Sequence, residues 1–159
     1  MRKVALVFAT LFLLATTGLG ILATNRGLKD AKAIDELVGP YKGAMAEAGK
    51  ADPQVAELAS LAQRTGKLKA GAVLFGIAGV LALGLLVLTF INKPIVPIVA
   101  AAVAGVAIIG TFVSPQYDLG PFAPASARSL GYVITVLAFA GAGAAWGASA
   151  LKRRRQAMA

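Results

Sequence analysis

Four long apolar segments dominate this sequence, at residues 4–24, 70–91, 95–113 and 129–151. None of them contains Asp, Glu, Lys or Arg. They hold about 21, 22, 19 and 23 residues, and at about 1.5 Å rise per residue each helix is long enough to cross the ~30 Å hydrocarbon core of a bilayer. The sequence therefore predicts an all-α integral membrane protein, built as a four-helix transmembrane bundle.

The four spans leave no room for a separate soluble domain. The chain has 159 residues, of which 58% are hydrophobic and only 14% are charged, whereas a soluble domain carries about 25% charged residues. We expect a single membrane domain over residues 1–159. Its connecting segments are a polar, partly helical loop at 25–69, a Pro-rich loop at 114–128 and a basic C-terminal tail at 152–159.

The residue types that most catalysis and metal binding require are scarce. The chain has no His and no Cys, which excludes His- or Cys-ligated haem, iron–sulfur clusters, Cys/His zinc sites and thiol catalysis. The spans also lack the charged groups that proton relays and ion sites need at membrane depth. We expect no enzyme, no cofactor and no catalytic or metal-ligating residue. One enzyme alternative stays open, a lipid-modifying activity that would use Tyr117 and Asp118 in the Pro-rich loop.

The polar loop between the first two spans contains one clear amphipathic pattern. Leu28, Ala31, Ile34 and Leu37 recur every third residue, which predicts a short helix over residues 27–38. Gly39 and Pro40 follow it and are expected to end it.

A second helix is predicted in the same loop. It is expected to begin at Asp52–Pro53 with Asp as the N-cap, to present Leu58 and Leu61 on an apolar stripe, and to end at Gly66. The apolar faces of this helical hairpin need a surface: each other, the membrane or a partner. Ile34, Leu58 and Leu61 are the candidate docking residues.

Basic residues gather beside the span ends. This distribution explains the net charge of +9 without a nucleic-acid partner. A tight turn at residues 92–94 makes the second and third spans antiparallel neighbours. Four spans put both termini on one side, together with Lys93. We expect this side to be cytoplasmic, because a basic run directly follows the last span and the first span is typical of an uncleaved signal anchor. The Ala/Gly-rich composition is typical of a bacterial inner (cytoplasmic) membrane.

Small residues predict where the helices touch. Inside lipid, helices associate where small side chains allow their backbones to approach closely. The last span carries such a seam with a spacing of alternately four and three residues, the third and second spans carry shorter ones, and Gly143 and Gly147 form a GxxxG pair on another face. The predicted helix-packing residues are Ala72, Gly76, Gly79, Ala100, Ala104, Ala107, Gly131, Ala138, Ala142, Gly143, Ala145 and Gly147.

The last span also carries candidate anchors. Tyr132 and Trp146 lie near its opposite ends, where an aromatic belt is expected. The basic run is interpreted as a topogenic anchor that binds anionic phospholipid headgroups, with docking to an acidic partner as the alternative. That run consists of Lys152, Arg153, Arg154 and Arg155.

The function that these features favour is a non-catalytic integral subunit. It would support assembly or stability of a larger membrane protein complex through helix packing and its amphipathic outward loop, with other integral membrane subunits and anionic phospholipids as partners. The alternative is a small homo-oligomeric transporter or channel for neutral or apolar solutes. Its pore would be lined by backbone and by hydroxyl side chains, namely Thr10, Thr16, Thr17, Thr111 and Thr135.

Overall fold

A computed structural model describes residues 2–41, 53–91, 93–115 and 127–157, and within these ranges the chain is helical apart from short connections. The long helices are α1 (Arg2–Val38), α3 (Pro53–Ile91), α4 (Val96–Val113) and α5 (Ala127–Ala157). A short 3-10 helix, η1 (Gly39–Tyr41), follows α1. The all-helical part of the predicted fold is confirmed.

All four long helices contain a stretch that is long and apolar enough to cross a membrane. These stretches lie within Arg2–Tyr41, Ala62–Ile91, Val96–Val113 and Arg128–Arg154. The third matches the predicted span 95–113 to within one residue. The first and second helices continue well beyond the predicted span ends.

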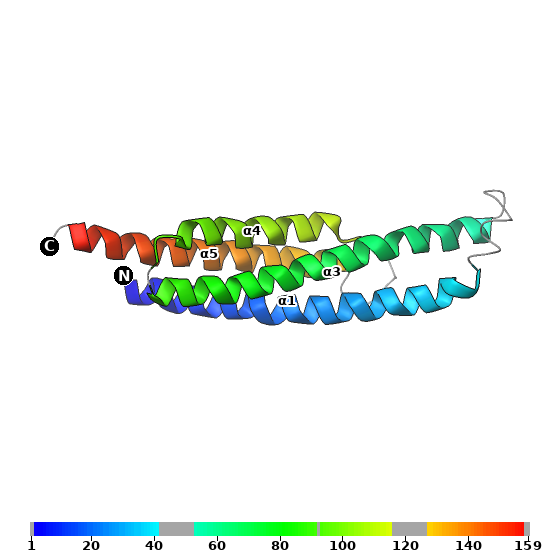
Figure 1. The fold of residues 1–159 in the computed structure, drawn as a ribbon, viewed down its shortest axis with the longest axis horizontal. Helices are drawn as coiled ribbons and strands as arrows, with labels where there is room; N and C mark the ends of the chain where they lie inside the picture. Colours follow the sequence, from blue (N-terminus) through cyan, green and yellow to red (C-terminus); the bar gives the residue numbers. More distant parts are fainter. Residues whose placement is uncertain (1, 42–52, 92, 116–126, 158–159) are drawn as a thin grey trace.

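The helices form an up-down-up-down bundle (Figure 1). Going around the bundle, α1 packs against α3, α3 against α4, α4 against α5, and α5 back against α1, while α3 also reaches α5 across the centre. Both ends of the chain lie at the same end of the bundle (Figure 1). The predicted antiparallel pairing of the second and third spans is therefore confirmed.

Helices α1 and α3 extend past α4 and α5 as a two-helix projection (Figure 1). We call this projection the arm, and define it as residues 26–41 of α1 and η1 together with residues 53–69 of α3. As predicted, α1 ends directly before Gly39 and α3 begins at Pro53. The predicted separate helix at 27–38 is instead the last part of α1.

The prediction that Gly66 ends a helix is wrong. Helix α3 runs through it without a break, and a β-carbon on Gly66 would have nothing within 4 Å. Thr65 and Leu68, on either side of it, are buried. Because the neighbouring turns are held by packing, the helix continues through a residue whose intrinsic preference is to stop it.

The core consists mostly of alanine, glycine and threonine, with few large side chains. Among the described residues, Phe75 is the largest fully buried side chain, and Leu13 is one of three fully buried leucines. Each fits against glycines of other helices: the ring of Phe75 lies against Gly110 and Gly131, and Leu13 lies against Gly141. The missing side chains of these glycines give the large residues their space.

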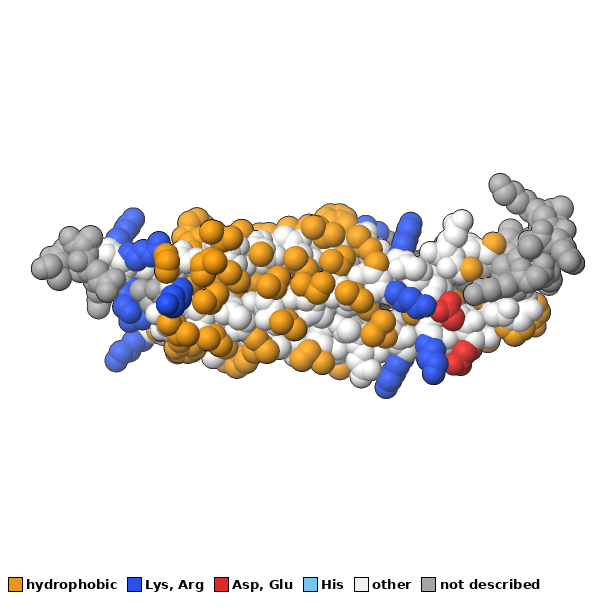
Figure 2. Space-filling view, viewed as in Figure 1, with side chains coloured by type: hydrophobic (Ala, Val, Ile, Leu, Met, Phe, Trp, Pro, Cys, Tyr) orange, Lys and Arg blue, Asp and Glu red, His pale blue; other side chains and the backbone are white. Residues whose placement is uncertain are grey.

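Large apolar side chains cover the outside of the bundle, and basic side chains lie at both ends of this apolar band (Figure 2). Acidic side chains appear only beyond the band, on the arm side (Figure 2). The exposed apolar residues of the band include Phe8, Leu11, Ile21, Val80, Val87, Phe90, Ile98, Phe112, Val136 and Phe139.

Candidate interaction surfaces

The helices α1 and α3 approach each other closely at glycine. A β-carbon on Gly20 would lie 2.6 Å from the carbonyl oxygen of Phe75 and 3.3 Å from the Cα atom of Gly79. Thr17 donates a hydrogen bond to the Gly79 carbonyl at 3.1 Å, and Thr24 donates one to the Ala72 carbonyl at 2.7 Å. Threonine and glycine therefore join the two backbones directly.

The α1 side of this interface was not among the predicted packing residues. Thr17, Gly20, Thr24 and Gly27 follow one another at alternate spacings of three and four residues, the same spacing that marked the last span. Applied to the first span, the same rule would have found them.

Most of the predicted packing residues lie between helices of this chain. Gly76 is close enough to Thr24 that a β-carbon on it would lie 2.9 Å from the threonine Oγ1 atom. The others in this group are buried, namely Ala72, Gly79, Ala100, Ala104, Ala107, Gly131, Ala138, Ala142 and Ala145.

A pair of threonines joins α4 to α5. The hydroxyls of Thr111 and Thr135 lie 2.9 Å apart, and Thr135 also reaches the Ala107 carbonyl at 3.1 Å. These are two of the residues proposed for a pore. The other three candidates also donate hydrogen bonds to backbone carbonyls of their own helix, Thr10 to Leu6, Thr16 to Phe12 and Thr17 to Leu13.

Gly143 and Gly147 differ from the other predicted packing residues. Both face outward on α5, and a β-carbon on either would have no atom of the described structure within 4 Å. Trp146 lies between them in sequence and is 59% exposed, and Phe139 is exposed one turn before Gly143. We call Phe139, Gly143, Trp146 and Gly147 the outer α5 face. It combines accessible backbone with two large aromatic side chains.

Tyr132, the other predicted belt aromatic, is also exposed on α5, near its N-terminal end. There the guanidinium of Arg128 lies over the ring of Phe112, 5.9 Å from the ring centroid. This contact fixes the start of α5 beside the end of α4.

Packing and a close ion pair hold the arm together. Ala31, Val38 and Leu68 are buried, and the Lys69 ammonium lies 2.6 Å from the Asp35 carboxylate. A second pair, Lys32 and Glu36 at 3.8 Å, lies along α1 itself.

The candidate docking residues of the arm fall into two groups. Ile34 is half-buried, whereas the side chains of Leu58 and Leu61 lie outside the described part of the structure. Leu37 and Tyr41, which were not singled out as docking residues, are 69% and 53% exposed.

The remaining predicted residues lie at the two ends of the bundle. Lys152 is half-buried, and Arg153 and Arg154 are exposed at the end of α5; the side chain of Arg155 lies outside the described part. Tyr117 and Asp118 are likewise outside the described residues. Among the residues that the structure does describe, no group of three acidic side chains could hold a metal ion.

Comparison with protein-family models, with curated proteins and with solved structures finds no match to this chain.

Proposed function

We propose that this protein is a non-catalytic, multi-pass membrane subunit that supports the assembly or stability of a larger membrane complex. The apolar band between two basic ends supports membrane insertion. The proposed location is a bacterial inner membrane, with both termini cytoplasmic and the arm on the opposite side.

The outer α5 face is the observation that carries this proposal. Glycines in membrane helices allow close backbone approach, and the bundle uses ten of the twelve predicted packing residues for its own packing. Gly18, Gly84 and Gly105 are also open, but each is a single glycine and none belongs to the predicted packing residues. Gly143 and Gly147 remain uncovered in the described structure, beside the exposed indole of Trp146. A helix of another integral subunit could approach α5 there and pack against the aromatic side chains.

The arm supports the same function outside the apolar band. It carries Leu37 and Tyr41 on its exposed side and is stiffened by the contact between α1 and α3. A four-helix bundle needs no such projection to pack its own spans. We interpret the arm as a rigid surface for an extramembrane part of the partner.

The pore alternative has less support. Its candidate hydroxyls donate their hydrogen bonds to backbone carbonyls, and the Thr111–Thr135 pair lies inside the contact between α4 and α5. Thr17, Thr111 and Thr135 therefore join helices of one chain, whereas Thr10 and Thr16 bond within α1.

The test is mild detergent extraction of the tagged protein from its native membranes, followed by native mass measurement and identification of the co-migrating chains. We expect the wild type to run with a reproducible set of other integral subunits. The variant Gly143→Leu/Gly147→Leu fills the outer α5 face and should lose this set. The control Gly84→Leu/Gly105→Leu places the same side chains at two glycines with nothing within 4 Å on α3 and α4, and should keep it. A pure homo-oligomer or a lone wild-type monomer would contradict the proposal and direct the work to solute-flux assays in liposomes.

A further inference from the structure

The bundle end that carries both chain termini is strongly and uniformly basic. Arg2 and Lys3 begin α1, Lys93 lies between α3 and α4, and Lys152 to Arg154 lie near the end of α5. The acidic side chains in the described part of the structure are Asp30, Asp35 and Glu36, and all three lie on the arm at the opposite end. Unlike the arm, this end therefore has no described carboxylate to neutralise it.

The terminal end and the arm also differ in their ion pairs. The salt bridges Lys69–Asp35 and Lys32–Glu36, each between described side chains, lie on the arm. At the terminal end, the Nε atom of Arg2 is buried and has no hydrogen-bond partner within the described part of the chain. Burying part of a charged group without a partner is unfavourable, so the Arg2 guanidinium favours an anion beside it.

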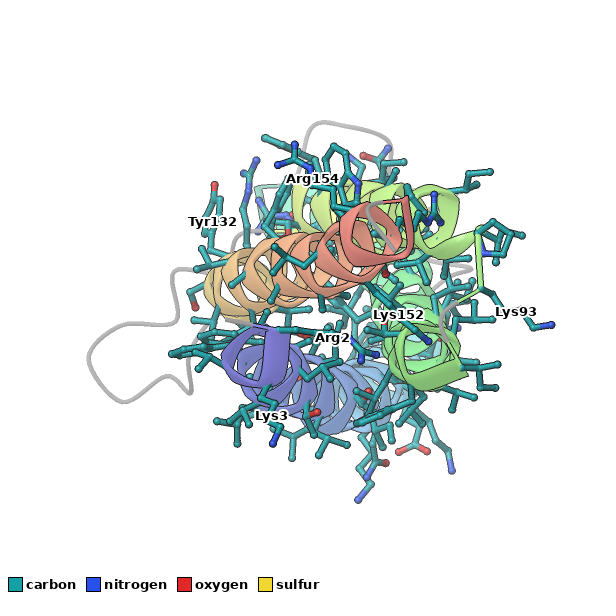
Figure 3. All side chains as sticks on the ribbon, turned by 90° about the vertical axis from the view of Figure 1, so that its left-hand side faces the viewer. Arg2, Lys3, Lys93, Tyr132, Lys152 and Arg154 are labelled. Carbon is teal, nitrogen blue, oxygen red and sulfur yellow. The ribbon has the colours of Figure 1, made fainter. Side chains whose placement is uncertain are left out.

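Arg2 and Lys152 point to a common space. Viewed from this end, the Arg2 side chain lies between α1, α3 and α5 and the Lys152 side chain extends from α5 toward α3, whereas Lys3, Lys93 and Arg154 extend away from the bundle axis (Figure 3). Both inner residues are half-buried, while the outer three are exposed. The inner pair offers a guanidinium and an ammonium to one anionic group, and the outer cations surround it with positive charge.

The surroundings of these cations indicate the kind of anion. Val4 in α1, Ile91 at the end of α3 and Ile95 directly before α4 lie at the same end of the bundle as the cations and are about half exposed. A ligand that contacts both the cations and these apolar side chains carries a phosphate next to apolar chains. Free phosphate would satisfy the cations alone, and a zwitterionic headgroup would bring its own cation toward the basic side chains.

We propose that the terminal end of the bundle binds the phosphate of an anionic phospholipid between Arg2 and Lys152. This inference rests on the proposed membrane insertion and is independent of any partner subunit. It extends the predicted headgroup contact of the C-terminal run to the first residues of α1.

Native mass spectrometry of the detergent-purified protein tests the proposal by resolving individual bound lipids. With phosphatidylglycerol and phosphatidylcholine of the same acyl chains present in equal amounts, we expect retention of phosphatidylglycerol. Arg2→Gln/Lys152→Gln should weaken its binding about 25-fold, since each juxtamembrane cation contributes about fivefold. Arg2→Lys/Lys152→Arg keeps the charge and should retain the lipid, which separates loss of charge from loss of fold.

A matched control removes two cations from the other end. Arg26→Gln/Lys29→Gln changes the net charge by the same amount at exposed positions of α1 and should leave the retained phosphatidylglycerol unchanged. Equal retention of the two lipids, equal losses in the two glutamine variants, or displacement of the lipid by excess inorganic phosphate would each overturn the proposal. None of these outcomes bears on whether a partner subunit binds the outer α5 face.

Discussion

The ring of Phe75 on α3 lies directly against the backbone of Gly131 on α5, so that a β-carbon on Gly131 would be only 2.7 Å from the ring Cζ atom. Gly110 of α4 faces the same ring, with a β-carbon position 3.1 Å from Cε1. One buried aromatic side chain therefore ties three helices together, and it fits only because two of them present glycine.

Gly131→Ala should destabilise the bundle by about 1–3 kcal/mol, the usual effect of overpacking a filled core. The added methyl group would also lie 2.8 Å from the Thr111 Oγ1 atom, so the ring has little room to move aside. Thermal unfolding in detergent measures the effect. Phe75→Leu should partly rescue Gly131→Ala in the double variant, and Gly84→Ala, at a glycine with open space around it, should be neutral. If Gly131→Ala matches the Gly84 control, Phe75 does not fill this space.

Gly20→Ala should be more damaging than Gly131→Ala. Its new methyl group would meet the carbonyl oxygen of Phe75 at 2.6 Å and the Cα atom of Gly79 at 3.3 Å. Because these are backbone atoms, no side-chain rotation relieves the contact, and α1 must move away from α3. The matched control is Gly18→Ala on the same helix, where nothing lies within 4 Å. Equal melting temperatures for the two variants would contradict the close α1–α3 contact.

The hydroxyls of Thr111 and Thr135 should be energetically coupled. Hydrogen bonds between membrane helices contribute about 0.6 kcal/mol on average, and these two hydroxyls lie 2.9 Å apart. A double-mutant cycle with Thr111→Val, Thr135→Val and the double variant isolates the coupling. The pair Thr16→Val and Thr135→Val serves as the control, because Thr16 donates its hydrogen bond within α1. A coupling equal to that of the control pair would show that the contact between α4 and α5 is made differently.

The absence of cysteine in the natural sequence makes the proposed orientation straightforward to test. Ala33 on the arm and Lys93 at the terminal end are both exposed. In intact cells, a membrane-impermeant maleimide should label Ala33→Cys and leave Lys93→Cys unlabelled, while a permeant reagent should label both. The reverse pattern would place both termini outside the cytoplasm.

The sequence was sufficient to predict the number of apolar helices and several of their ends. α3 ends at Ile91 and α4 begins at Val96, as expected from the polar residues and proline that separate them. The continuous arm could not be predicted in the same way. Hydropathy falls after residue 24, but α1 stays helical because Gly27, Ala31 and Val38 remain buried, and this packing depends on a helix far away in the sequence.

The packing residues could be predicted only in part, because their partners also lie far away in the sequence. A small-residue seam shows that a helix has a close neighbour, but the neighbour is not visible in the spacing. The role of Gly131 becomes clear only once Phe75 is known to lie opposite it. In the same way, the spacing places Gly143 on a different face of the last span from Ala142, but it does not show that only the face of Ala142 is covered by this chain.

The most direct test of the proposed subunit role is photo-crosslinking in native membranes with a benzophenone amino acid at Gly147 or at Gly105. At neither position would a β-carbon lie within 4 Å of another helix of the described structure, and a crosslink that raises the mass of the chain on a denaturing gel reports a second chain. We expect a discrete crosslink to one different integral membrane protein from Gly147 and none from Gly105. Crosslinks from Gly147 to lipid alone, or to a second copy of this chain, would contradict the account.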